Sequence, residues 1–171
     1  VLNVSIAPPA DLTCVITSVT LTSSSSTLGL TYNWGGGNTT TTNLVAAAGT
    51  YGVTVTDPAN NCSASTSVVV NQNITIPNVS IAPPATLTCA ITSVTLTASS
   101  STIGVTYEWG GGNTSTTNLV SAAGTSGVVV TDPANGCSAS SALPANQSIA
   151  WPKVSIGPPA PLTLCITSVT L

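Results

Sequence analysis

Charged side chains are scarce in this chain of 171 residues. One basic residue, four acidic residues and no histidine make up 3% of the sequence, whereas soluble domains carry about 25% charged residues. A single lysine cannot follow a phosphate backbone, which excludes nucleic acid as a partner. Without histidine, a serine or cysteine nucleophile lacks its usual base. We therefore expect no catalytic residue and no cofactor, and a surface of Thr, Ser, Asn and Gly.

Long apolar runs are also missing, although hydrophobic residues make up 42% of the chain. No uninterrupted apolar stretch approaches the roughly 20 residues that a membrane-spanning helix needs. Helix signals are absent, and short alternating runs are separated by turn residues throughout. The sequence therefore predicts an all-β protein with no membrane span in this part of the chain.

The sequence is a tandem repeat. The phrase LTCVITSVTL at 12–21 returns as LTCAITSVTL at 87–96, and its end returns at 166–171. Two cysteines and a tryptophan recur 75 positions later, as Cys14 and Cys89, Trp34 and Trp109, and Cys62 and Cys137. We expect a window on a longer array, divided into the tail of a preceding repeat, two complete repeats, and the first strands of a third, incomplete repeat. These parts are residues 1–2, 3–77, 78–152 and 153–171.

Each repeat shows the strand pattern of an immunoglobulin-like β-sandwich. Short alternating runs bounded by glycine, proline or asparagine predict strands at 18–24, 30–37, 43–57 and 62–72, with a glycine turn inside the third run. A tryptophan on the third strand and a tyrosine at the start of the sixth are typical of this fold. We expect Trp34 and Trp109 in the core, and Tyr51 in the position of a tyrosine corner.

Proline pairs recur at the start of each repeat, as Pro8 and Pro9, Pro83 and Pro84, and Pro158 and Pro159. Proline cannot donate a backbone hydrogen bond to a sheet, so each pair belongs to a stiff connector or to a sheet edge. We expect these pairs to set the angle between neighbouring domains.

Several motifs carry a resemblance to a known family. They are LTYNW at 30–34, VTYEW at 105–109, AGTYGVTVTD at 48–57, DPANNC at 57–62 and DPANGC at 132–137. These motifs resemble the immunoglobulin-like and polycystic-kidney-disease-like repeats of very large surface adhesins of Bacteroidetes, including SprB-like gliding-motility adhesins. The resemblance implies an outer-surface fibre, exported by the type IX system and anchored through other parts of the polypeptide.

The five cysteines indicate an oxidising compartment. Cys14 and Cys62 lie in the first repeat, Cys89 and Cys137 in the second, and Cys165 in the third. This spacing is typical of a secreted disulfide framework and not of a CxxC metal or redox site. Buried reduced thiols are the alternative. We expect an extracellular or cell-surface protein.

Two disulfide pairings are consistent with the 75-residue repeat. Pairs within a repeat join Cys14 to Cys62 and Cys89 to Cys137, whereas pairs between repeats join Cys62 to Cys89 and Cys137 to Cys165. A bridge needs Cα atoms within about 7 Å. If the first strand starts at the pole that carries the turn between the last two strands, the pairs within repeats satisfy this limit. We favour them, which leaves Cys165, one position later than its counterparts, unpaired or in an inter-repeat bridge.

The acidic residues offer little for metal binding. Asp57 and Asp132 occupy equivalent positions, while Asp11 and Glu108 are not repeated. A calcium site usually needs several oxygen ligands, including more than one carboxylate. Each DPAN segment instead predicts an Asx-type turn, capped by the aspartate side chain. We expect no metal site.

Two substitutions distinguish the second repeat from the first. Tyr51 is replaced by Ser126, and Val69 by Pro144. The first change removes a corner hydrogen bond, and the second removes a backbone donor from the last strand. We expect the second repeat to be the less stable domain.

Together these features predict a structural and adhesive protein, a tandem stalk that forms an extracellular filament on a bacterial surface. Its partners would be copies of itself, in a head-to-tail or continuous fibre, with glycans or a surface as further partners. Residues 153–171 either begin the next domain or insert into an adjacent chain as a donated strand.

Two other functions remain open from the sequence. A carbohydrate- or ice-binding module could use threonine arrays on a flat sheet, with Trp34, Trp109 or Tyr32 stacked on sugar rings. A surface-array lattice protein would differ from the fibre only in geometry.

Overall fold

The computed structural model describes residues 2–149, 154, 155 and 157. The strands of the described residues fall into two groups, which we call unit 1 and unit 2. Unit 1 contains β1 (Ser5–Ile6), β2 (Leu12–Thr13), β3 (Val19–Ser24), β4 (Thr31–Asn33), β5 (Thr42–Val45), β6 (Gly49–Thr56), β7 (Ser63–Val70) and β8 (Gln72–Asn73). Unit 2 contains β9 (Ser80–Ala82), β10 (Val94–Ser99), β11 (Thr106–Trp109), β12 (Thr117–Val120), β13 (Gly124–Thr131) and β14 (Ser138–Ala145). Within the described residues, no helix has the length and apolar character to cross a membrane.

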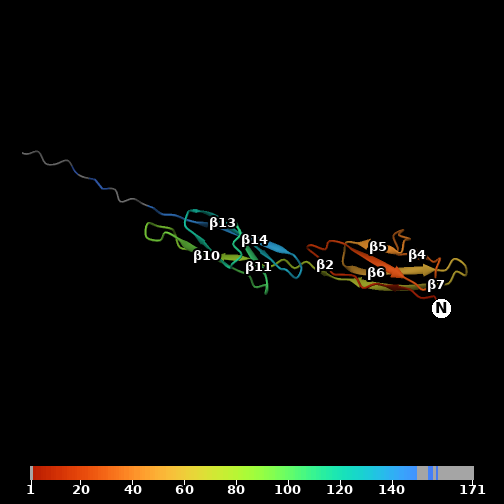
Figure 1. Cartoon of the computed structure of the whole chain (residues 1–171). Coiled ribbons are helices and arrows are strands. Elements are labelled where there is room, and N and C mark those ends of the chain that lie inside the picture. Colours follow the sequence, from red (N-terminus) through yellow and green to blue (C-terminus); the bar gives the residue numbers. More distant parts are fainter. Residues whose placement is uncertain (1, 150–153, 156, 158–171) are drawn as a thin grey trace, which may run out of the picture.

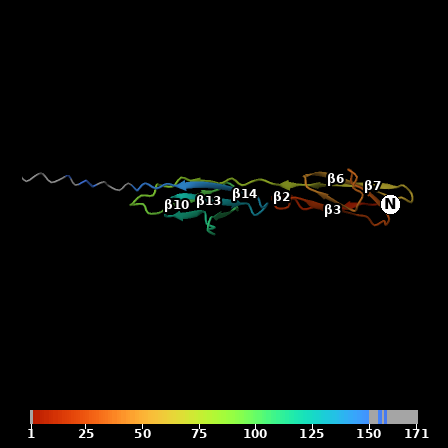
Figure 2. The same cartoon turned by 90° about the horizontal axis from the view of Figure 1, so that it is seen from above.

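Each unit is an immunoglobulin-like β-sandwich, as the alternating pattern predicts. In unit 1, one sheet has the order β1-β3-β5 and the other β4-β6-β7, while β2 pairs in parallel with β8 beyond β7. Unit 2 repeats this arrangement with sheets β12-β10-β9 and β11-β13-β14, and a parallel bridge between Leu87 and Gln147 replaces the β2–β8 pair. Figures 1 and 2 show the two sandwiches lying end to end, with β2 at the end of unit 1 that faces unit 2.

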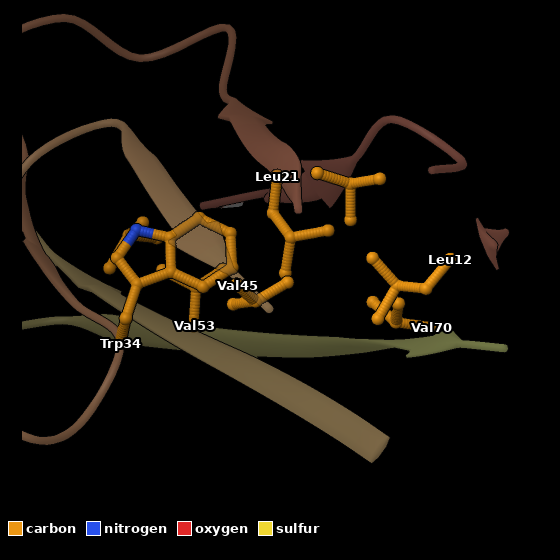
Figure 3. Packing of buried hydrophobic residues seen from close by; sticks show 8 residues of the cluster. Leu12, Leu21, Trp34, Val45, Val53 and Val70 are labelled. Carbon is orange, nitrogen blue, oxygen red and sulfur yellow. The ribbon is translucent and has the colours of Figure 1, made fainter. Parts of the chain in front are cut away.

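The core of unit 1 forms one continuous cluster. On β3 the inward-facing Val19, Leu21 and Ser23 are buried and alternate with exposed residues. On β6 the inward-facing Val53 and Val55 are buried, and Tyr51 is half-buried. Figure 3 shows the Trp34 ring beside Val53 and Leu21, with Leu12 and Val70 at the other end of the cluster. The Trp34 indole N–H donates to the Thr40 carbonyl at 2.9 Å, so the ring is buried without an unpaired donor.

The buried residues of unit 2 form two clusters, and the half-buried Val120 packs against both of them. Trp109 lies with Leu96 in one cluster, and its indole N–H donates to the Ser115 carbonyl at 2.9 Å. Leu87, Val94 and Ala145 form the other cluster. Ala145 stands where unit 1 has Val70. The smaller side chain fills less of the space between the two ends of the core, which gives a physical reason for the division.

The predicted tyrosine corner is present in unit 1. Tyr51 is half-buried against the core, and its hydroxyl donates to the Ala47 carbonyl at 2.9 Å. Ser126 stands at this position in unit 2, where β13 pairs with β14 along all eight residues, as β6 pairs with β7. Pro144 lies on β14, at an edge of its sheet, which is where proline is tolerated in β-structure.

The connector role predicted for the proline pairs is wrong for the two pairs that the structure describes. Pro8 and Pro9 lie between β1 and β2, inside unit 1, and Pro83 and Pro84 follow β9 inside unit 2. Each pair follows the first strand of its unit, at the point where the chain leaves that sheet. The chain then pairs with a different segment, β8 in unit 1 and Gln147 in unit 2. Proline is tolerated between these two pairings because no sheet hydrogen bond needs its missing N–H there. The units are instead connected through residues 74–79. Pro158 and Pro159 lie outside the described residues.

Candidate functional site at the junction between the units

A disulfide crosses from one unit to the other. It joins Cys14 of unit 1 to Cys137 of unit 2, with 5.1 Å between their Cα atoms and a sequence separation of 123. Among the cysteines that the structure describes, Cys62 and Cys89 are free and exposed. Both pairings weighed from the sequence are therefore wrong for the four cysteines that the structure describes. Cys165 lies outside the described residues.

The reason for this correction lies in the strand order. Cys14 directly follows β2 and is separated from the start of β3 only by the turn at 15–18, so it lies at the pole of unit 1 where β3 begins. Thr31, at the start of β4, pairs with Thr56, at the end of β6, so the turn at 57–62 lies at the pole where β3 ends. Cys14 and Cys62 are thus at opposite poles of one sandwich, and a bridge between them is out of reach.

The turn that carries Cys14 is held by one threonine. Residues 13–16 form what we call the threonine turn of unit 1. The Thr13 N–H donates to the Ile16 carbonyl at 2.9 Å, and Thr13 Oγ1 accepts the N–H groups of Val15 at 3.2 Å and Ile16 at 2.9 Å. These bonds fix the backbone on both sides of Cys14, which therefore points its sulfur out of the pole of the sandwich.

The turn that carries Cys137 is held by an aspartate and an asparagine. We call residues 132–137 the aspartate turn of unit 2. Asp132 Oδ1 accepts the N–H of Ala134 at 2.9 Å, which is the predicted Asx-type turn. The Asp132 N–H donates to the Cys137 carbonyl at 2.9 Å, and Asn135 Oδ1 accepts the Cys137 N–H at 2.8 Å. Within the described residues, no group of three or more His, Cys, Asp or Glu side chains could hold a metal ion.

Asn135 is the main polar contact across the junction. Its side chain is only 2% exposed. Its Nδ2 donates to Asn73 Oδ1 at 3.1 Å and to the Thr75 carbonyl at 2.9 Å, both on the stretch that leaves unit 1. Its own carbonyl accepts the N–H of Cys14 at 3.1 Å. A buried amide whose hydrogen-bonding groups are satisfied in this way fixes the relative position of the two turns.

Val15 lies against Gly136 at the junction. A Cβ atom added to Gly136 would overlap Val15 Cγ2 and would lie 3.4 Å from Val15 Cβ. Gly136 also has a φ of 69°, in the left-handed region that glycine adopts readily. The junction therefore needs glycine here, both for the backbone and for the space that Val15 occupies.

The same two turns recur at the outer poles of the two units, where no described residue makes the contacts seen at the junction. The aspartate turn of unit 1 is residues 57–62, which carry Cys62, and the threonine turn of unit 2 is residues 88–91, which carry Cys89. Sequence reasoning missed this arrangement because it considered only pairs between neighbouring cysteines. The signal that could have found it is the change from DPANNC to DPANGC, which puts glycine only where the turn meets another unit.

The aromatic residues offered as a sugar platform do not form one. Trp34 is 9% exposed and Trp109 is fully buried. Tyr32 is half-buried against the core of unit 1. Their aromatic faces therefore serve packing, and the stacking surface that a carbohydrate site would use is missing at these positions.

Comparison with known proteins places the chain by fold alone. No family model matches it, and no curated protein matches it. Several solved structures are similar to it in fold. Three N-terminal domains of the bacteriophage RB49 highly immunogenic outer capsid protein are 22% identical, with 87% of this chain and 59% of that chain covered and a TM-score of 0.44. Titin fragment I67–I69 is 11% identical, with 85% and 66% covered and a TM-score of 0.41. Murine CEACAM1b is 17% identical, with 86% and 100% covered and a TM-score of 0.35.

Proposed function

We propose that this chain is a segment of an extracellular, non-catalytic stalk that bears load. The observation that supports the proposal is the disulfide between Cys14 and Cys137, since it adds a second covalent connection between units already joined by residues 74–79. A peptide connector alone leaves two domains free to bend and rotate. A second covalent connection, with the buried contacts of Asn135, removes that freedom.

The bridge also changes how tension passes through the molecule. When the two ends of the chain are pulled, the shortest covalent path runs from Cys14 directly to Cys137. Residues 15–136 therefore lie outside the loaded path, and they include most strands of both sandwiches. Such a stalk would stretch little even if a unit unfolded, because the closed loop could not extend.

Location and assembly follow from chemistry. Disulfides persist in oxidising compartments, which favours an extracellular or surface protein. With a net charge of −3 over 171 residues, copies repel one another weakly, which favours packing into fibres. The resemblance to Bacteroidetes surface adhesins supports a bacterial outer surface and type IX export.

Force spectroscopy on single molecules tests the load-bearing role. The oxidised chain, pulled by its two termini, should show no step as long as a whole unit, because only the flanking strands β1, β2 and β14 remain in the loaded path. After reduction, unfolding should release roughly 200 Å per unit. Equal steps before and after reduction would contradict the proposal, because the bridge would then carry no tension.

Electron microscopy of the native protein tests the filament. Continuous thin fibres, beaded at the ~40 Å spacing of an extended sandwich domain, are expected. Discrete particles of two units would contradict the filament and would favour a binding module.

A further inference from the structure

We propose that Cys89 of one copy of this chain forms a disulfide with Cys62 of a second copy, so that copies join head to tail through a junction like the internal one. This inference rests on the proposed function and names the partner and the link. Cys62 lies at the pole of unit 1 away from unit 2, and Cys89 lies on the turn equivalent to that of Cys14, at the pole of unit 2 away from unit 1. They cannot pair within one chain.

The free aspartate turn already has the shape of the occupied one. Asp57 Oδ1 accepts the N–H of Ala59 at 2.9 Å, and the Asp57 N–H donates to the Cys62 carbonyl at 2.9 Å. Asn60 Oδ1 accepts the Cys62 N–H at 2.9 Å. The equivalent bonds in the occupied turn differ by no more than 0.1 Å. A partner therefore meets a preformed surface, which lowers the entropic cost of binding.

The free threonine turn is preformed in the same way. The Thr88 N–H donates to the Ile91 carbonyl at 2.9 Å, and Thr88 Oγ1 accepts the N–H groups of Ala90 at 3.2 Å and Ile91 at 3.0 Å. Cys89 is held between these bonds and is exposed. Its N–H is equivalent to that of Cys14, which donates across the internal junction.

Side-chain sizes at the free turns argue for a second copy of this chain as the occupant. At the internal junction, Val15 is matched by Gly136. At the free turns, the equivalent residues are Ala90 and Asn61, and Asn61 has a φ of 58°, close to that of Gly136. In both junctions a small residue therefore faces a larger one: Gly136 faces Val15 in the internal junction, and Ala90 would face Asn61 in the proposed one. Val15 with Asn61 would clash, whereas Ala90 with Asn61 leaves room for the asparagine side chain.

The polar contacts can also be reproduced. Asn60 is the counterpart of Asn135, and its Nδ2 now donates to Asp57 Oδ2 at 2.9 Å, within its own turn and exposed. A rotation of this side chain would release Nδ2 toward the partner. Ser148 stands where Asn73 accepts a bond at the internal junction, and its hydroxyl is also an acceptor.

The covalent step is an oxidation. Two thiols lose two protons and two electrons as the sulfur–sulfur bond forms. With glutathione disulfide as the oxidant, one cysteine first forms a mixed disulfide and releases one glutathione. The thiolate of the other cysteine then displaces the second glutathione, so that two reduced glutathione molecules balance the new bond.

A mixing experiment tests the pairing. All chains carry Cys165→Ser, and one set also carries Cys62→Ser while the other carries Cys89→Ser. After incubation in a glutathione redox buffer, non-reducing electrophoresis should show a dimer in the mixture, in several-fold excess over either variant alone. Equal dimer formation by each variant alone would overturn the proposal, as would its absence from all three samples.

A size swap tests the predicted contact. Ala90→Val in the chain that supplies Cys89 should lower the dimer yield several-fold, because the valine meets Asn61. Asn61→Gly in the other chain should restore the yield, since the pair then matches Val15 and Gly136. Both substitutions place residues that the equivalent turns already carry, so folding is preserved. An unchanged yield with Ala90→Val would overturn the proposed contact.

These experiments distinguish failure of the proposed disulfide between copies from failure of the proposed load-bearing function. The mixing experiment needs no fibre, and the force measurement uses only the internal bridge. If fibres of the Cys62→Ser, Cys89→Ser double variant equalled those of the native chain, the link would be overturned while the load-bearing role would stand.

Discussion

The two units place the same turn in two environments. In unit 1, the aspartate turn at 57–62 faces away from the other unit, and Cys62 is free and exposed. In unit 2, the aspartate turn at 132–137 meets the threonine turn of unit 1, and Cys137 is 1% exposed and bridged. The backbone N–H groups of the two turns make equivalent hydrogen bonds, and only the Nδ2 group of the asparagine changes its partner. The local sequence therefore sets the shape of the turn, and the partner adds only the bridge, the buried asparagine and the steric match.

The largest effect should come from removing the bridge. Cys14→Ser opens a loop with a sequence separation of 123, which in the chain-entropy model lowers the free energy of unfolding by about 4 to 5 kcal/mol. Cys89→Ser, at the equivalent free turn, should leave that free energy unchanged in the monomer. Guanidinium denaturation of both variants and of the native chain measures the difference. If Cys14→Ser and Cys89→Ser lowered the free energy of unfolding equally, the account would be contradicted, because only Cys14 is bridged in the monomer.

A second contrast exchanges the residues that differ between the turns. Gly136→Asn copies unit 1 into the occupied turn, where it meets Val15, and should cost about 1 to 3 kcal/mol because the junction becomes overpacked. Asn61→Gly, the reverse change in the free turn, meets no partner in the monomer and should change stability by about 0.5 kcal/mol or less. Denaturation of the oxidised chains measures both. Adding Val15→Ala should restore part of the loss at Gly136, and no restoration would contradict the contact.

A third contrast concerns the two asparagines. Asn135→Ala removes two hydrogen bonds across the junction and leaves the N–H of the buried Cys137 without its acceptor, at a cost of about 1 to 3 kcal/mol. Asn60→Ala removes an exposed contact and should cost less. Thermal unfolding of the two variants, followed by circular dichroism, compares them. A larger loss for Asn60→Ala would contradict the assignment of Asn135 as the junction residue.

The smallest expected difference in stability is between equivalent substitutions at the tyrosine-corner position of the two units. Tyr51→Phe keeps the ring and removes the bond to the Ala47 carbonyl, at a cost of about 1 kcal/mol. Ser126→Ala, at the equivalent position, should be nearly neutral. Calorimetry of the reduced chain should also show unit 2 melting below unit 1, because its buried residues form two clusters and it lacks the tyrosine corner. A higher melting temperature for unit 2 would refute that order.

The sandwich could be predicted because its signals are local. The alternation at 19–24 and 49–56 fixes which side chains face inward, and the turn residues between runs mark the ends of strands. Burial of Trp34 follows from that alternation. The Asx-type turns at Asp57 and Asp132 could be read from DPAN for the same reason.

The junction could not be predicted because it depends on distant pairing. The first strand of each unit is split at a proline pair and changes sheets, and this moves Cys14 to the pole opposite Cys62. No local pattern reports that change. The role of Asn135 is equally hidden, since Asn60 occupies the same motif and forms no contact across a junction.

The central claim is the bridge between Cys14 and Cys137, and peptide mapping of the unreduced chain tests it most directly. Cleavage before aspartate at Asp11, Asp57 and Asp132 separates Cys14, the pair of Cys62 and Cys89, and Cys137 into three different peptides. With Cys165→Ser to remove the remaining thiol, we expect peptide 11–56 linked to peptide 132–171 in mass spectrometry. Peptide 57–131 linked to both of the others would mean pairing within units and would contradict the account.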